Sequence, residues 1–184
     1  MRISYLIFAA ITSVAAGQQP PKTPCDFDGF DTNSKLAETL KSGDPLVVNR
    51  VEGDWTCGYL AGRKGSGQSW VRSRDIRMVS FDPNPLSTAW AGTWVQGPNR
   101  IRIQGSTVPG KVSLHGEAYW HGFGDNVHSG EFSAEASPSG NKLHVEDDSC
   151  KIDLALLGKY IVANDNNMCG GANVRFWGVW RRAR

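Results

Sequence analysis

The side chains best suited to chemistry in this sequence are histidines and carboxylates on one predicted strand. His115, Glu117 and His121 lie at even spacings, so a strand places them on the same face. That face is the polar, outward one, where histidines are solvated or paired with an acid on a neighbouring strand. Zinc needs three or four converging ligands, so this spacing predicts no metal site.

Catalysis has equally little support in the sequence. No serine lies in a Gly-x-Ser-x-Gly turn, and the glycine-rich loop 62–67 lacks the Gly-x-x-x-x-Gly-Lys-Ser/Thr pattern of a phosphate loop. Glu117 and Glu131 could cleave a glycosidic bond only at about 5 to 10 Å from each other inside a cleft, and a meander of short turns offers no cleft. We therefore expect no enzyme activity and no cofactor.

Aromatic side chains are the stronger candidates for binding. Trp55 follows a Gly-Asp turn, Trp70 follows a long glycine-rich loop, and Tyr59 lies on the strand between them. Tryptophan and tyrosine bring large contact areas at little cost in rotamer entropy. The alternative is that the three rings form the core of a module short of other large side chains. We predict a ligand-binding set of Trp55, Tyr59 and Trp70, with Trp55 the most exposed.

The four cysteines form neither a Cys-x-x-Cys motif nor a Cys/His cluster at zinc spacing. Four cysteines allow three disulfide pairings. We favour Cys25 with Cys57 and Cys150 with Cys169, because each pair then lies inside one module. Such bonds persist outside the reducing cytoplasm.

The first residues are typical of a secretory signal peptide. Arg2 supplies a positive charge, 3–16 is a short apolar stretch, and Ala15, Ala16 and Gly17 offer a cleavage site. A membrane anchor would need about 20 apolar residues, more than this stretch provides. We expect residues 1–17 to be removed and the protein to be periplasmic or secreted.

Charge says little about the partner. The formal net charge is +2, which gives no case for nucleic-acid binding, and no other segment has an apolar run long enough to span a membrane. The exception is the C-terminal cluster of Arg181, Arg182 and Arg184. It leaves open a weak contact with a polyanion such as anionic lipid or a cell-wall polymer.

Proline-rich stretches divide the chain. Residues 18–24 and 81–89 are expected to be linkers, because proline cannot donate a hydrogen bond to a strand ladder. Between them a helix-like segment covers 33–41. Strands are expected over 45–51, 55–60 and from Trp70 onward.

The segment after residue 89 alternates short strands with short turns, which predicts an eight-stranded antiparallel meander or barrel. Apolar and polar residues alternate within it, as where Ile101 and Ile103 oppose Arg100 and Arg102. The strands are expected over 90–95, 99–104, 111–121, 127–136, 142–146, 151–157, 159–163 and 173–180. The predicted fold class is therefore all-β, stapled by two disulfides.

The segment from Leu40 to Val79 resembles a bacterial SH3-like domain. The resemblance rests on a Gly-Asp turn before an apolar strand, a Gly-Asp-Trp turn and a closing Trp-Val pair. These lie at Gly43-Asp44, Gly53 to Trp55, and Trp70-Val71. The resemblance implies a small five-stranded barrel over 25–80 that contacts cell-wall peptides or other proteins.

The segment from Cys150 to Arg182 resembles the closing segment of periplasmic lysozyme-inhibitor LprI-type proteins. The shared features are the two cysteines, an Asp-Asn-Asn turn at Asp165, a Cys-Gly-Gly run at Cys169 and a final aromatic-basic strand. The resemblance implies that a loop, with Asp165 to Met168 as the candidate, blocks a wall-degrading enzyme.

The pair Trp90 and Trp94, with Gly92 and Thr93 between them, is similar to the Gly-x-Trp opening of lipocalins and the Gly-Thr-Trp of avidins. This similarity implies a small-molecule cavity inside the barrel over 90–184. Eight strands permit such a cavity but do not require one.

Together these patterns predict a non-catalytic exported binding protein of the bacterial cell envelope, in which an SH3-like domain precedes a small barrel. The expected partner is a cell-wall peptide or an envelope protein, bound through Trp55, Tyr59 and Trp70. Inhibition of a wall-degrading enzyme and a lipocalin-like ligand cavity are the alternatives.

Overall fold

The computed structural model describes residues 6–9, 19–23, 25, 41–60 and 68–183 of the 184-residue chain. The chain divides into two compact units, Met1–Phe81 and Asp82–Arg184, here called unit 1 and unit 2. Apart from two three-residue 3-10 turns, every regular element in the described part is a β-strand, which confirms the all-β prediction. The helix-like segment predicted over 33–41 lies outside the described residues except for Lys41.

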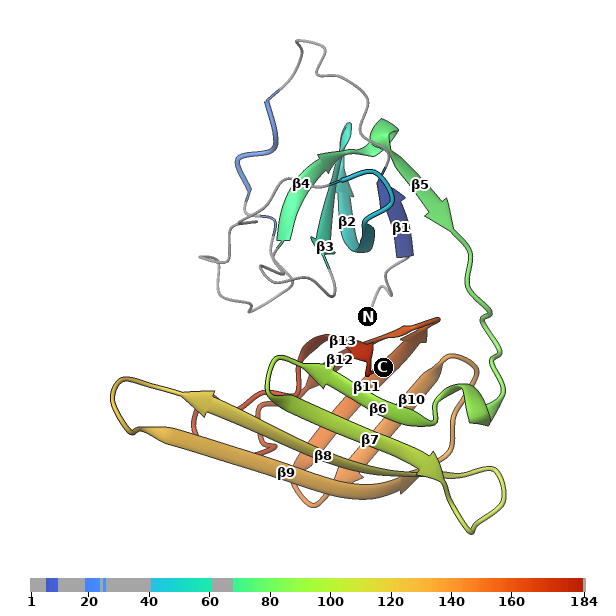
Figure 1. Ribbon diagram of the computed structural model, residues 1–184, viewed down its shortest axis with the longest axis vertical. Helices are drawn as coiled ribbons and strands as arrows, with labels where there is room; N and C mark the ends of the chain where they lie inside the picture. The colour runs from blue at the N-terminus through green and yellow to red at the C-terminus, as the bar shows by residue number, and fades with distance from the viewer. Residues whose placement is uncertain (1–5, 10–18, 24, 26–40, 61–67, 184) are drawn as a thin grey trace. The chain divides into compact units, whose positions relative to one another are not determined.

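Unit 1 contains one antiparallel sheet with strand order β4-β3-β2-β1-β5 (Figure 1). The strands are β1 (Leu6–Ala9), β2 (Pro45–Glu52), β3 (Trp55–Leu60), β4 (Gln68–Arg72) and β5 (Ile76–Val79), with the 3-10 turn η1 (Ser73–Asp75) before β5. The turn between β2 and β3 needs a left-handed residue, and Gly53 supplies it with a φ of +56°.

Strand β1 falls inside the segment predicted to be a signal peptide. It has a partner on each side, because Leu6 pairs with Val47 of β2 and also with Val79 of β5. Strand β5 is joined to the rest of the sheet through β1. Residues predicted only to direct export therefore contribute an inner strand to unit 1.

Unit 2 is an eight-stranded antiparallel sheet that nearly closes into a barrel, with strand order β10-β11-β12-β13-β6-β7-β8-β9 (Figure 1). Its strands are β6 (Gly92–Gln96), β7 (Asn99–Gly105), β8 (Val112–His121), β9 (Val127–Ala136), β10 (Lys142–Asp147), β11 (Cys150–Leu157), β12 (Tyr160–Asp165) and β13 (Gly178–Arg182), and the 3-10 turn η2 (Ser87–Ala89) precedes β6. The two outer strands of the sheet meet where the Asp147 carboxylate accepts the Ser133 backbone N–H at 2.8 Å.

Side chains fill the inside of unit 2. The inward positions of its alternating strands, such as Ile101 and Leu114, are buried, and the largest buried side chains are Trp90, Trp94, Phe132, Phe176 and Trp180. Two of the buried indoles donate to backbone carbonyls four residues away: Trp94 to Trp90 at 3.0 Å and Trp180 to Phe176 at 3.1 Å. Each large apolar side chain buried in this way stabilises the fold by about 1.5 to 3 kcal/mol.

Both predicted disulfides are confirmed. Cys25 is bonded to Cys57 of β3, and Cys150 of β11 is bonded to Cys169. The second bond holds the loop after β12 against β9, where the Gly171 N–H donates to the Ser129 carbonyl at 3.1 Å. Each bond therefore lies within one unit.

The last predicted strand, over 173–180, begins only at Gly178. Asn173 is left-handed with a φ of +66°, and the Phe176 N–H donates to the Asp165 carboxylate at 2.5 Å rather than to a neighbouring strand. These residues form a side-chain-bonded loop, which strand periodicity does not reveal. Most of the linker predicted over 81–89 likewise packs in unit 2, where Pro83 accepts the Asn141 N–H at 2.9 Å.

Among the residues described, no helix has both the length and the apolar character to cross a membrane.

Candidate functional site

The predicted binding residues gather on one face of the sheet in unit 1. Trp55, Cys57 and Tyr59 alternate along β3 and so point to the same side. On β4, Arg72 pairs with Trp55 and Trp70 pairs with Cys57. Residues directly opposite each other on paired strands share a face, so both tryptophans lie on this side.

A bulge in β2 adds Arg50 to the same face. Val48 pairs with Gly58 and Arg50 pairs with Cys57, so that Asn49 is an extra residue in the ladder. Two residues of the bulged strand therefore oppose one residue of β3, which reverses the alternation after Val48. Arg50 thus faces the tryptophans, whereas strict alternation would have placed it with Val48.

Each tryptophan carries an arginine over its ring. The Arg72 guanidinium lies 4.5 Å from the centre of the Trp55 ring, and that of Arg50 lies 5.3 Å from the centre of the Trp70 ring. Contacts of this kind are attractive by about 0.5 to 1 kcal/mol at exposed sites. We call the surface made by Arg50, Trp55, Trp70 and Arg72 the aromatic–arginine face.

The three predicted ligand residues differ in burial. Trp55 and Trp70 are half-buried, whereas Tyr59 is only 8% exposed and packs at the end of the row. The Trp55 indole N–H is buried and has no hydrogen-bond partner among the residues described. A buried indole donor left unpaired is costly to the fold.

A segment from the N-terminal side crosses the face. The Trp70 indole donates to the Thr23 carbonyl at 2.9 Å, and the Thr23 hydroxyl donates to the Glu52 carboxylate at 2.7 Å. Two residues later Cys25 is bonded to Cys57 in the middle of the face. Within the predicted linker, Thr23 is thus attached to β2 and β4, and Cys25 just after it is attached to β3.

A small polar hollow of about 180 Å³ lies beside the Trp55 end of the face. Gly53, Asp54, Arg72, Ser73 and Arg74 line it. Of the two arginines, Arg72 lies over Trp55 and Arg74 pairs with Asp75 at 3.9 Å, so the hollow combines basic groups with the acidic Asp54.

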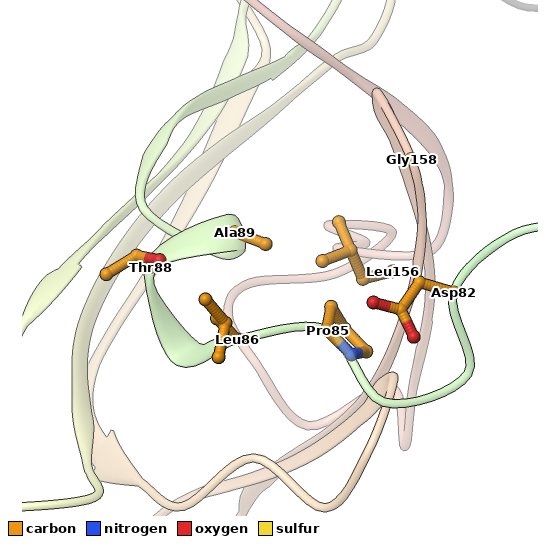
Figure 2. Close-up of a pocket in the computed structure, with 7 residues that line it drawn as sticks. All are labelled: Asp82, Pro85, Leu86, Thr88, Ala89, Leu156 and Gly158. Atoms are coloured by element: carbon orange, nitrogen blue, oxygen red, sulfur yellow. The ribbon is translucent and has the colours of Figure 1, made fainter.

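Unit 2 contains a separate, mostly apolar hollow of about 400 Å³. Figure 2 shows Pro85, Leu86, Ala89 and Leu156 around a common space, with the Asp82 carboxylate turned toward it. Thr88 and Gly158 complete the lining. This hollow lies between the segment before β6 and the β11–β12 turn, whereas Trp90 and Trp94, which suggested a lipocalin-like cavity, are buried in the core.

The histidines and acids of unit 2 pair with one another on its outer surface. The His115 ring contacts the Ser133 hydroxyl at 2.9 Å and Glu117 at 3.3 Å, and His121 is exposed. Glu117 and Glu131 lie directly opposite each other on β8 and β9. No group of three potential metal ligands is found in the part of the chain that the structure describes.

His144 forms the most extensive of these pairs. Its ring contacts Asp153 at 2.7 Å and Glu146 at 3.2 Å. The hydrogen bond to Asp153 and then that to Glu146 raise the pKa of His144, because both acids stabilise the protonated ring. Lys151 and His144 in turn lower the pKa of Glu146 by hydrogen bonding to its carboxylate.

The C-terminal arginines differ in role. The Arg182 guanidinium stacks on Trp94 at 4.4 Å and donates to the carbonyls of Ala89, at 2.5 Å, and Ala91. Arg181 is exposed, and Arg184 lies outside the described residues. Arg182 is therefore used in closing the barrel, and of the predicted cluster only Arg181 is seen to face solvent.

The loop Asp165–Met168, predicted as an inhibitory element, is held by its own side chains. The Asn166 side-chain amide donates to the Ser149 carbonyl at 2.7 Å, and its oxygen accepts the N–H groups of Lys151 and Met168. Met168 is 59% exposed at the end of this loop.

Sequence reasoning missed Arg50, Arg72 and Thr23 as members of the site. The signal for Arg72 was present, because it lies two residues after Trp70 on a predicted strand. Arg50 depends on the bulge and Thr23 on a contact 47 residues away in sequence, and neither leaves a local pattern.

Comparison with models of known protein families, with curated proteins and with solved structures finds no match to this chain.

Proposed function

We propose that this protein is a non-catalytic, exported binding protein of the bacterial cell envelope, which contacts a cell-wall peptide or a protein partner through the aromatic–arginine face. The observation that carries the proposal is the Trp70 indole, which already donates to the main-chain carbonyl of Thr23. A surface that binds one main-chain carbonyl can bind those of other chains, because every peptide has them.

The surroundings of Trp70 support peptide binding over catalysis. The two tryptophans are half-buried, so each offers ring area to a partner while its position is held by an arginine. Half-buried tryptophans and arginines are the residue types that most often dominate the energy of an interface. The paired acids Glu117 and Glu131, by contrast, lie on an outward sheet face and not at either of the hollows described above.

Export is supported by the disulfides and by the predicted signal peptide. Two disulfides fit an oxidising compartment such as the periplasm or the cell exterior. The near-neutral charge and the use of Arg182 inside the barrel favour a peptide partner over a nucleic acid or another polyanion.

The test separates binding from stability in one variant. Trp55→Ala should weaken binding to purified bacterial cell wall by about 2 kcal/mol, the scale of an interface anchor, while the protein remains folded. If Trp55 is instead a core residue, the same change should cost about 3 to 5 kcal/mol of stability. Cosedimentation with wall and thermal melting measure the two effects.

Trp120→Ala is the matched control, because Trp120 is a half-buried tryptophan of unit 2, whose ring lies tilted against His128 with the ring centres 5.2 Å apart. It should leave wall binding unchanged. Equal loss of binding in both variants, or loss of fold in Trp55→Ala with no separable binding defect, would remove the aromatic–arginine face as the site.

A second candidate function is inhibition of a lysozyme-type enzyme by the loop Asp165–Met168. It is favoured by the exposed Met168 side chain on a loop fixed by Asn166 and by the adjacent disulfide. A rigid loop loses little entropy when it enters a cleft. Met168→Asp should then abolish inhibition of lysozyme turnover without lowering the melting temperature, and wall binding should not change.

A further inference from the structure

The segment Gln19 to Thr23, which reaches the aromatic–arginine face at Thr23, has the features of a bound peptide. Thr23 contacts Glu52 of β2 and the Trp70 indole of β4, and Cys25, two residues later, is bonded to Cys57 of β3. By the strand register, Glu52, Cys57 and Trp70 lie on the same face. The segment therefore crosses the strands over the surface that carries both tryptophans.

The composition of this segment suits recognition as an extended chain. It contains Pro20 and Pro21, whose fixed φ angles favour the polyproline II conformation. Such a chain is already extended before it binds, so little entropy is lost, and its carbonyls remain free to accept hydrogen bonds. Pro21 is half-buried, whereas Pro20, Lys22 and Thr23 are exposed, so the contact is shallow.

The disulfide explains how a shallow contact persists. Thr23 lies only two residues before Cys25, which is bonded to Cys57 within the face. A tether this short holds the segment at an effective concentration on the order of millimolar or above. Weak hydrogen bonds then suffice to keep the segment on the face. A partner peptide must displace the segment before it can bind.

We propose that Gln19 to Thr23 is an intramolecular ligand that occupies the peptide site in cis, and that the partner which replaces it is an extended, proline-containing peptide. This inference rests on the proposed function, since it assigns the partner class and the regulation of the same face. The cis segment competes with the partner, so affinity for the partner is set by how firmly the segment is held.

The test compares the full chain with a variant in which Gln19 to Thr23 are replaced by glycine and serine in alternation. Both disulfides and the chain length are kept. The probe is a fluorescently labelled peptide with the sequence of residues 18–24, Gln-Gln-Pro-Pro-Lys-Thr-Pro. The exchanged variant should bind this probe at least about tenfold more tightly than the unaltered chain, because the tethered competitor has been removed.

Three controls define the contact. Trp70→Phe in the exchanged background should weaken probe binding, since the ring is kept and the donor is lost. A probe with alanine in place of its prolines should bind more weakly. Met78→Ala, at an exposed position of β5, should leave binding unchanged. Melting and disulfide mapping establish that each variant is folded, and the milder pair Pro20→Ala and Pro21→Ala should give an intermediate affinity.

The outcomes separate this inference from the proposed function. If the unaltered chain and the glycine–serine variant bind the probe with equal affinity, the segment does not occupy the peptide site, but the proposal of wall binding through Trp55 still stands. Wall binding that depends on Trp55, with no probe binding by either chain, would overturn the proline-containing partner. Failure of both chains to bind either probe or wall would remove the proposed function as well.

Discussion

Gly130 on β9 lies close against the backbone of the loop that contains Cys169 and Gly170. A Cβ atom added there would lie 2.1 Å from the Cys169 carbonyl oxygen and 2.8 Å from the Gly170 Cα. Both atoms are backbone, and the Cys150–Cys169 disulfide fixes the loop to which they belong. Gly130→Ala must therefore displace either β9 or the bonded loop.

The cost of this displacement should be large for a single methyl group. Overpacking of well-packed sites typically costs about 1 to 3 kcal/mol, and a clash with tethered backbone belongs at the upper end of that range. For a domain of about 100 residues, 2 to 3 kcal/mol lowers the melting temperature by roughly 10 to 20 °C. We expect a shift of that size for Gly130→Ala.

The assay is thermal and urea unfolding followed by near-ultraviolet circular dichroism, which reports the buried tryptophans of unit 2. Gly105→Ala on β7 is the matched control, because a Cβ there has no atom within 4 Å. A reductant that opens the disulfide should shrink the difference between the two variants, since the loop can then move. If Gly130→Ala and Gly105→Ala have the same melting temperature in the oxidised protein, the disulfide-bonded loop is not held against β9 in solution.

Three further predictions follow from other features of unit 2. Cys169→Ser should destabilise the unit by about 3 kcal/mol, from the chain entropy of a closed loop of about 20 residues, and an unchanged melting temperature would mean that the bond is not formed in solution. No hydrolysis of wall polymers, esters or peptides is expected, and turnover abolished by Glu131→Gln would establish an enzyme instead. His144 should make stability depend on pH: its raised pKa stabilises the fold fully below about pH 6.5, its ordinary value, and this contribution is lost as the pH rises through the higher folded-state pKa. His144→Gln should flatten the dependence of the urea midpoint on pH above about pH 6.5, and an unchanged pH profile would assign the dependence to other groups.

Much of unit 2 could be predicted from its sequence because its determinants are local. The alternation around Ile101 and Ile103 places one side of β7 in the core, and the predicted strand over 127–136 coincides with β9. The disulfide pairing followed from the division of the chain into modules. Each of these inferences needed only neighbouring residues or the order of segments along the chain.

The candidate site was only partly predictable because its geometry depends on register. The alternation of side chains along a strand predicted that Trp55 and Tyr59 lie on one face. It did not predict that Tyr59 is buried, because burial depends on how the side chain packs. Arg50 reaches the face through the bulge at Asn49, and Thr23 through a contact with Trp70. A bulge and a long-range hydrogen bond are decided by the folded sheet as a whole.

Strand β1 would link the folding of this protein to its proposed export. The same residues, Leu6–Ala9, lie in the segment that the export machinery would recognise and pair on both edges within the sheet of unit 1. Export as proposed would require that these residues be kept from pairing with β2 and β5 until the segment is recognised. Removal of the predicted signal peptide would then take away the strand that joins β2 to β5, so the sheet of the shortened chain would differ from the one described above.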